Sequence, residues 1–189
     1  MILHIKNMVC NRCKMVVKSE MEQLGYKPVY VSLGEVTLEK ELTNHEKSII
    51  DKRLQLVGFA IIDDKKSRLI EKIKTLIVEQ VHHKNNELKT NLSDYLTREL
   101  HHDYKYITTL FTEVEGTTIE KYFIAQKIER VKELLVYDEF SLKEIAFQLN
   151  YSSVAHLSAQ FKKVTGLTPS HFKDIRSEKR KPLDEVKFI

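Results

Sequence analysis

Cysteine is scarce in this chain, and long hydrophobic runs are missing. Only two cysteines occur in 189 residues, and they stand three positions apart. That spacing is poorly suited to a structural disulfide, so we expect a reducing, cytoplasmic environment. No apolar run approaches the roughly 18 residues that a membrane-spanning helix needs, and the first ten residues lack the charged and then apolar design of a signal peptide. We therefore expect neither a membrane partner nor secretion.

The sequence also lacks the usual signatures of catalysis. Its five glycines form no phosphate-cradling loop, and its acidic residues form no pair in a catalytic context. No nucleophile stands with an evident base. We therefore expect that the protein is not an enzyme.

Residues 141–172, SLKEIAFQLNYSSVAHLSAQFKKVTGLTPSHF, predict two helices joined by a tight turn. Apolar residues recur at helical spacing, and the period restarts out of phase after the turn: Leu142, Ile145, Ala146, Leu149, Val154, Leu157, Phe161 and Val164. Asn150 tolerates the left-handed conformation that stops a helix, and the serines that follow can cap the next one. Gly166 ends the second helix, and Pro169 suits the first turn of a third. The pattern indicates a helix-turn-helix.

An earlier helix-turn-helix is predicted between residues 92 and 116. Its turn falls at His101-His102-Asp103, where Asp103 can cap the second helix, and Gly116 ends that helix. The segment ITTLFTEVEGTT parallels LSAQFKKVTGLT 50 residues later, with the Phe and the Gly in register. We expect a long helix from Ile119 to Tyr137 to connect the two units.

Positive charge is concentrated near the C-terminus. The whole chain carries 31 Lys and Arg against 27 Asp and Glu, a net charge of +4. Residues 151–181 hold seven basic side chains against two acids, which accounts for the whole excess. A basic strip on one module is what attraction to nucleic-acid phosphates requires. The alternative interpretation is a solvated helix face followed by a charged tail.

Residues 1–62 predict a small α+β domain. Alternating segments indicate four strands, at residues 2–5, 30–33, 36–38 and 59–62. Helical stripes indicate one helix over residues 11–25 and another that starts at a capping box, Thr43-Asn44-His45-Glu46, and ends at Gly58. The order βαββαβ is the ferredoxin-like layout. The predicted fold class is thus a ferredoxin-like α+β domain followed by an all-α domain with two helix-turn-helix units.

A polar joint at residues 63–67 separates the two domains in this interpretation. We expect the second domain to cover residues 68–175 and a basic tail to cover residues 176–189. The apolar stripe over residues 69–81 indicates either a dimer seam or the first helix of the second domain. We prefer the second because two heptads are short for a coiled coil; a homodimer is the alternative. The paired histidines at 82–83 and 101–102 are expected to be exposed, since neighbouring residues on a helix point about 100° apart.

Two helix-turn-helix units joined by a long helix resemble the DNA-binding domain of the AraC/XylS family. The resemblance covers about residues 66–175 and is strongest in KIERVKELLVYDEFSLKEIAFQLNYSS and FKKVTGLTPSHFK. It implies a transcription regulator whose two recognition helices enter successive major grooves on one face of double-stranded DNA.

The same resemblance assigns groove-facing positions in each recognition helix. In the first helix they are Lys105, Thr108 and Thr109, and in the second Val154, Ala155, His156 and Ala159. Ala and Val cannot pair with base edges, although a methyl group can contact thymine. His156 is therefore the one polar reader of the second helix, unless it is an exposed residue with no partner. The candidates for phosphate contacts are Ser152, Ser153, Lys162 and Lys163.

The N-terminal part resembles the heavy-metal-associated domains. Met8-Val9-Cys10-Asn11-Arg12-Cys13, between the first strand and the first helix, is similar to their M-x-C-x-x-C loop. The resemblance implies Cys10 and Cys13 as metal ligands, with Met8 and Phe59 beside the loop. The chain departs from the pattern at Asn7, where the family usually has Gly, and at the Arg between the thiols.

The chemistry of the two thiols allows three interpretations. A helix N-terminus favours thiolates, and two soft thiolates suit Cu(I) or another soft metal ion, whereas a structural Zn²⁺ site needs four ligands. A redox pair is less favoured because a 62-residue βαββαβ unit lacks the thioredoxin-like context. The third interpretation is a domain that serves interaction or dimerisation.

The sequence as a whole predicts a sequence-specific DNA-binding transcription regulator that responds to a soft metal ion such as Cu(I). The alternative is a metal-trafficking or protein-docking module, in which the N-terminal domain binds a partner and the helical half does not read DNA. Binding to duplex DNA that weakens steeply with salt would distinguish the first from the second.

Overall fold

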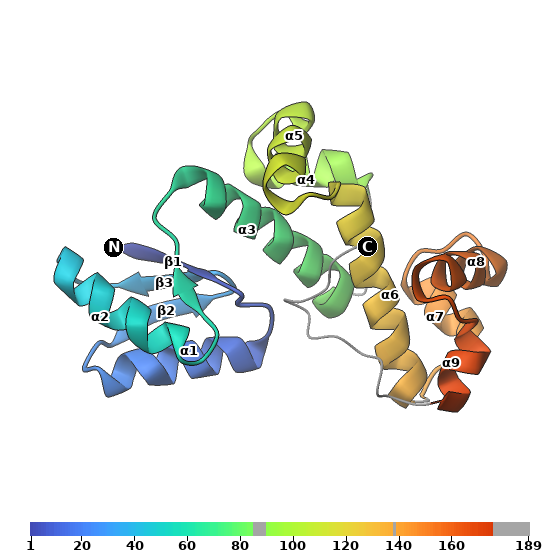
Figure 1. Ribbon diagram of the computed structural model, residues 1–189, viewed down its shortest axis with the longest axis horizontal. Coiled ribbons are helices and arrows are strands. Elements are labelled where there is room, and N and C mark those ends of the chain that lie inside the picture. Colours follow the sequence, from blue (N-terminus) through green and yellow to red (C-terminus); the bar gives the residue numbers. More distant parts are fainter. Residues whose placement is uncertain (85–89, 138, 176–189) are drawn as a thin grey trace. The chain divides into compact units, whose positions relative to one another are not determined.

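The computed structural model describes residues 1–84, 90–137 and 139–175 (Figure 1). The chain divides into two compact units, the first ending at Thr75 and the second beginning at Leu76. Within the described ranges, no helix combines the length and the hydropathy needed to cross a bilayer. The predicted basic tail, residues 176–189, lies outside the described residues.

The first unit contains a small four-stranded antiparallel sheet. Its elements are β1 (Ile2–Lys6), α1 (Asn11–Gln23), β2 (Pro28–Ser32), β3 (Glu35–Leu38), α2 (Asn44–Gln55) and β4 (Ala60–Ile61), followed by the start of α3 (Lys65–Val78). The predicted order βαββαβ is confirmed, and the strands lie in the order β2-β3-β1-β4. Thr43 and Glu46 form the predicted capping box at the start of α2.

The core of this unit lies between the sheet and its two helices. On β1, Leu3 and Ile5 are buried while His4 between them is half-buried, as strand alternation predicts. They pack in one cluster with buried residues of β3 and of both helices: Val36, Leu38, Val17, Met21, Ile50 and Leu54. Because both helices share this cluster with the same sheet residues, they cover one face of the sheet (Figure 1).

The predicted linker at residues 63–67 is only partly a linker. Helix α3 begins at Lys65, and the backbone N–H of Ser67 donates to Oδ1 of Asp64 at 2.8 Å. The polar run therefore starts a helix rather than forming an open joint. The division between the units falls inside α3, later than the sequence pattern suggested.

The second unit is helical. After the last three residues of α3, residues 76–78, it contains the π-helical turn η1 (Glu79–His83), α4 (Leu92–Leu100), α5 (Tyr104–Glu115), α6 (Ile119–Tyr137), α7 (Leu142–Gln148), α8 (Val154–Thr165) and α9 (Pro169–Ile175). The predicted long helix has the expected bounds. Figure 1 shows α4 and α5 near one end of α6 and α7, α8 and α9 near the other.

Each helix-turn-helix is anchored to α6 by buried aromatic rings. In the first, the ring of Phe111 on α5 lies 5.6 Å from the ring of Tyr122 on α6. In the second, Phe161 on α8 and Phe172 on α9 meet edge to face at 5.5 Å. These two rings share one core with apolar residues of α6 and α7: Ile128, Val131, Leu134, Leu135, Ile145 and Ala146.

The turns contain residues in the left-handed region. Asn150 has φ of 52°, as the sequence predicted, and His101 in the earlier turn has φ of 54°. Gly116 and Gly166 end α5 and α8 with φ of 67° and 78°. A side chain at either glycine would be strained in that conformation, which explains why the paired units repeat a glycine there.

The expectation that the paired histidines are exposed is wrong for His82. The turn η1 buries this residue to 8% exposure, and its Nε2 lies 3.1 Å from Oε1 of Gln126 on α6. Gln126 in turn donates from Nε2 to the hydroxyl of Tyr122 at 3.0 Å. A π-helical turn shifts the phase of the helix, so a periodicity argument cannot anticipate which side faces inward. His83, His101 and His102 are exposed.

Candidate nucleic-acid interface

The helix predicted to be the first recognition helix, α5, is capped by Asp103. Its Oδ1 accepts hydrogen bonds from the backbone N–H groups of Lys105 at 2.8 Å and Tyr106 at 3.3 Å, so the predicted N-cap is confirmed. Lys105 and Thr109 are exposed. Thr108 is half-buried, and its hydroxyl donates to the backbone oxygen of Tyr104 at 2.9 Å. Because this hydroxyl hydrogen is already donated, Thr108 could contact a DNA groove only through its hydroxyl oxygen, as a hydrogen-bond acceptor.

The helix predicted to be the second recognition helix, α8, begins after Ser153. The hydroxyl of Ser153 accepts a hydrogen bond from the backbone N–H of His156 at 3.0 Å and caps the helix. Ala155, His156 and Ala159 are exposed. Val154 is different, because it is half-buried and packs against the core of the second helix-turn-helix. Among the predicted groove-facing positions of this helix, His156 is therefore the polar one.

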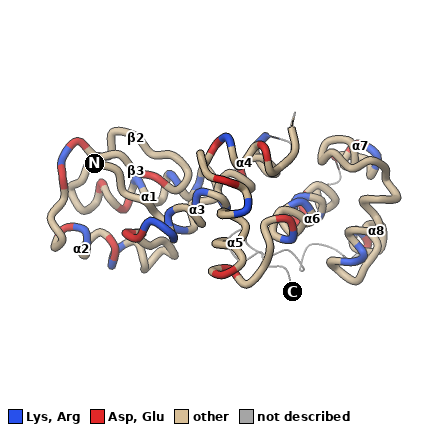
Figure 2. Tube along the Cα trace, turned by 90° about the horizontal axis from the view of Figure 1, so that it is seen from above, with Lys and Arg blue, Asp and Glu red and all other residues tan. Residues whose placement is uncertain are grey.

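The four candidates for phosphate contacts lie at opposite ends of α8. Ser152 and Ser153 precede the first turn, while Lys162 and Lys163 are exposed in the last turn. Among the residues that the structure describes, neither lysine forms an ion pair. Helix α8 carries no acidic residue, whereas α6 carries both signs (Figure 2). A lysine near a helix C-terminus also stabilises the helix dipole, so their position alone does not assign them to DNA.

A buried lysine packs against the second helix-turn-helix, and it is not among the residues that the sequence predicted. Lys127 on α6 is 7% exposed, and its Nζ lies 3.8 Å from the centroid of the Tyr151 ring and 5.6 Å from that of Phe123. Burial lowers the pKa of Lys127 to about 8. The signal was present in the sequence: Lys127 lies three residues after Ile124 and four before Val131, on the apolar stripe of α6.

Residues 96–175 match the family model described as "Helix-turn-helix domain". This segment is an AraC-type helix-turn-helix domain. The match runs from within α4 to the end of α9, and so includes α5 and α8.

Curated relatives of this domain are transcriptional regulators by name. The chain is 28% identical over 105 residues to an uncharacterized HTH-type transcriptional regulator, YtdP, of Bacillus subtilis, covering 55% of this chain and 13% of that protein. It is 34% identical over 68 residues to the xylose operon regulatory protein of Escherichia coli, covering 36% of this chain and 17% of that protein. The chain thus spans less than a fifth of either relative's length.

A solved structure supports the fold of the helical part. The chain is similar to the C-terminal domain of AraT, a response regulator from Geobacillus stearothermophilus, with a TM-score of 0.51 and 22% sequence identity. The similarity covers 62% of this chain and 95% of that domain. At this identity it bears on the fold alone.

Outside the AraC-type domain, the two cysteines lie close together. Cys10 is the residue before α1, and its Sγ lies 3.1 Å from Sγ of Cys13 in the first turn. Met8 and Phe59 are 2% and 8% exposed and belong to the core of the first unit. Asn7 has φ of 71°, a conformation that Asn tolerates better than most residues, so it can stand where the resemblance expects Gly.

The acidity of Cys13 differs from the expectation. Burial, and next the hydrogen bond with Cys10, raise the pKa of the Cys13 thiol above its ordinary value. The helix N-terminus favours the thiolate, but removing the sulfur from water has the larger effect here. Within the described ranges, no group of three or more His, Cys, Asp or Glu side chains is placed to hold a metal ion. A site at this loop would have two thiols as its ligands.

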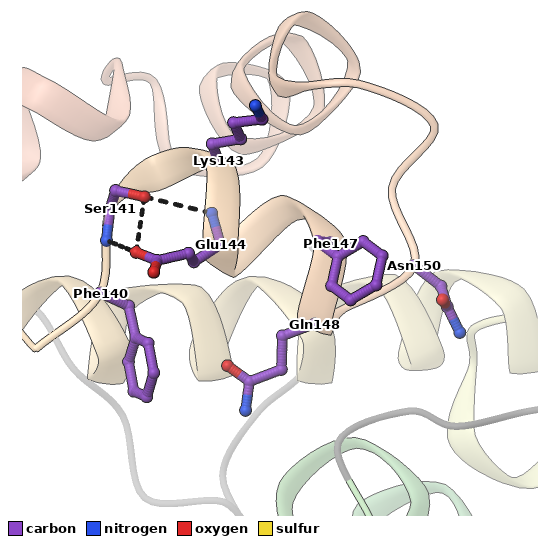
Figure 3. A pocket seen from close by; sticks show the side chains of 7 residues that line it. All are labelled: Phe140, Ser141, Lys143, Glu144, Phe147, Gln148 and Asn150. Carbon is purple, nitrogen blue, oxygen red and sulfur yellow. Dashed lines mark hydrogen bonds between the residues drawn. The ribbon is translucent and has the colours of Figure 1, made fainter.

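A surface hollow of about 860 Å³ lies beside α7 in the AraC-type domain (Figure 3). Phe140 and Phe147, which are 39% and 84% exposed, line it together with polar residues. Among the described residues that line it, the one carboxylate, on Glu144, accepts hydrogen bonds at 2.7 Å from both the backbone N–H and the hydroxyl of Ser141. That carboxylate is engaged in capping α7, so this described part of the lining offers no paired acids for general acid–base chemistry.

Proposed function

We propose that the chain is a sequence-specific DNA-binding transcription regulator of the AraC type. The observation that carries this proposal is the arrangement of two capped recognition helices on a single connecting helix. Helix α6 has 19 residues, a length of about 28 Å at 1.5 Å per residue. One turn of B-DNA is roughly 34 Å, so a helix of this length can hold two readers in successive major grooves.

The two recognition helices make unequal contributions in this proposal. The exposed face of α5 has Lys105 and Thr109, whose side chains can pair with base edges or phosphates. The exposed face of α8 has Ala155 and Ala159, which can contact only a thymine methyl group, and the polar His156. Base selectivity should therefore depend mainly on α5, and α8 should contribute contact area and one polar contact.

The test is binding of the full chain to duplex DNA as a function of salt. A selection from a random-sequence duplex library first yields a preferred site, and fluorescence anisotropy then measures affinity between 50 and 300 mM salt. Several phosphate contacts predict a linear fall of log K with log salt. Absence of duplex binding even at the lowest salt would contradict the proposal and favour a protein-docking function for the helical half.

We further propose that the first unit is a ferredoxin-like, heavy-metal-associated type of domain that binds a soft metal ion. The strand order β2-β3-β1-β4, with both helices on one face, supports the classification. The pair of Cys10 and Cys13 sulfurs 3.1 Å apart, with Met8 buried nearby, supports the site. Two thiols fit a soft ion of low coordination number such as Cu(I) and do not complete a structural Zn²⁺ site.

Metal binding would act on transcription only if it changes the affinity for DNA. A typical coupling of about 1–3 kcal/mol changes affinity by roughly 5–150-fold, and DNA must change the metal affinity by the same factor. A Cu(I) titration against a competing chelator, with the Cys10→Ser/Cys13→Ser double variant alongside, tests uptake. Equal DNA affinity with and without saturating Cu(I) would exclude a sensor, whether or not the metal binds.

A further inference from the structure

The imidazole of His156 is held by two neighbours that precede it in the chain. Its Nδ1 lies 3.0 Å from the hydroxyl oxygen of Ser152, and its ring meets the ring of Tyr151 edge to face at 5.3 Å and 85°. The ring is exposed at the first turn of α8. The orientation of this side chain is therefore set before any ligand arrives.

Tyr151 is itself fixed from two other elements. Its hydroxyl donates to Oε1 of Gln160 on α8 at 2.7 Å, and the ammonium group of Lys127 on α6 lies over its ring. Tyr151 is 8% exposed and belongs to the core of the second helix-turn-helix. A ring with contacts to two helices is a rigid support, so His156 has few alternative positions.

We propose that Ser152 and Tyr151 position His156 so that its Nε2–H donates a hydrogen bond to guanine in the major groove. This inference rests on the proposed DNA-binding function and deepens it. Ser152 then acts through His156 and is not the phosphate contact that the sequence suggested. Because its Nδ1 faces Ser152, the ring has only Nε2 left for a ligand.

The donor role of Nε2 follows from the surroundings of Nδ1. The hydroxyl of Ser152 can donate to a lone pair on Nδ1, which leaves the proton on Nε2. A protonated imidazole also carries hydrogen on Nε2, so the outward nitrogen is a donor in both forms.

The choice of guanine follows from the pattern of groups in the major groove. Guanine presents two acceptors, N7 and O6, whereas adenine places an amino donor beside its N7, cytosine presents a donor, and thymine presents a single acceptor, O4, beside its methyl group. Only guanine therefore offers two acceptors to a single N–H donor. A phosphate oxygen is an acceptor as well, and the two targets differ in whether the contact depends on sequence.

The experiment uses the full chain and the site selected for the wild type. At the base pair that His156 reads, guanine should be preferred by a factor on the order of ten, the worth of one hydrogen bond. His156→Ala should abolish this preference, and Ser152→Ala should weaken it severalfold. Ser152→Thr, which keeps the hydroxyl, should restore it. Lys143→Ala, an exposed change on α7, serves as the control and should leave the preference unchanged.

Replacing that guanine by 7-deazaguanine removes the N7 acceptor and provides a second measurement. The wild type should lose affinity on the modified duplex, while His156→Ala should bind both duplexes equally. A uniform loss across all sequences in His156→Ala, with a smaller salt slope, would overturn the inference and assign the residue to phosphate. Failure of the wild type to bind any duplex would instead contradict the proposed function on which the inference rests.

Discussion

The ammonium nitrogen of Lys127 lies 3.8 Å from the centroid of the Tyr151 ring, which joins the middle of α6 to the turn of the second helix-turn-helix. Burial lowers the pKa of Lys127 to about 8, because the charged form loses water. The contact with the face of the Tyr151 ring offsets part of this desolvation free energy, by about 0.5–2 kcal/mol for a desolvated cation–π contact. The charged form of Lys127 on α6 therefore helps to hold Tyr151 in the turn between α7 and α8.

The shifted pKa of Lys127 predicts a pH dependence of stability. Between pH 8 and the ordinary value of 10.5, the unfolded chain binds a proton at this lysine that the folded chain does not. The free energy of unfolding should therefore rise over that window, by at most about 3 kcal/mol at 1.36 kcal/mol per unit. Urea denaturation from pH 7 to 10 measures the rise.

Lys127→Met should flatten this rise, because it removes the titrating group while keeping most of the buried volume. Lys143→Met changes an exposed lysine of α7 and should leave the rise intact. The raised pKa values of Tyr95, Tyr104 and Tyr151 act in the opposite sense as the pH approaches 10, because the unfolded phenols then lose protons that the folded ones keep. These tyrosines are present in both proteins, so the difference between the wild type and Lys127→Met isolates the lysine. A rise that persists in Lys127→Met would show that another group causes it.

Phe161→Ala should strongly destabilise the helical unit. Phe161 is fully buried, and its ring packs against Phe172, so the change leaves a cavity in the core of the second helix-turn-helix. We expect a loss of about 3–5 kcal/mol in the free energy of unfolding, measured by chemical denaturation. Phe147→Ala removes a ring that is 84% exposed and should cost no more than about 0.5 kcal/mol. Similar losses in both variants would refute the assignment of the core.

Asp103→Ala should weaken the start of the first recognition helix. The carboxylate accepts hydrogen bonds from two backbone N–H groups that would otherwise lack a helical partner. The expected loss is about 1 kcal/mol, and Asp103→Asn should recover most of it, because Asn caps helices nearly as well as Asp. Thermal denaturation of the wild type and the two variants measures these differences. If Asp103→Asn were no more stable than Asp103→Ala, the negative charge of Asp103, and not its capping hydrogen bonds, would contribute the stability.

Lys105→Ala should reduce DNA affinity and relax the base preference at one position of one half-site. Lys105 is exposed in the first turn of α5, where a recognition helix contacts base edges. Binding to a panel of sites mutated at single positions measures the preference. Lys143→Ala removes the same charge from α7 and should retain the preference. Equal weakening on every site of the panel would reassign Lys105 to a phosphate.

Elements with strong local signals were predictable from the sequence. The bounds of α6, the capping box at Thr43, and the caps at Asp103 and Ser153 all agree with the structure. Each depends on residues three or four apart, or on a single turn residue such as Asn150 with its positive φ. Interactions over that range are complete within one helical turn, so their residue types suffice to recognise them.

Some errors arose where a local signal had two outcomes. The polar run at residues 63–67 has the composition of a linker, yet Asp64 makes it the start of α3. The helix N-terminus at the cysteine loop favours a thiolate, yet burial raises the pKa of Cys13. In the first case helix capping by Asp64 outweighed the polar composition, and in the second burial of the thiol outweighed the helix N-terminus. Composition alone does not show which of two such effects is larger.

The candidate site shows the same division between local and long-range information. Local patterns were sufficient to locate α5 and α8 and to predict that His156 lies near the start of α8. They could not reveal that Lys127 supports Tyr151, or that His82 bonds to Gln126, 44 residues away. Such pairs meet only when the helices pack, because burial and partner choice depend on the whole core rather than on neighbours in the chain.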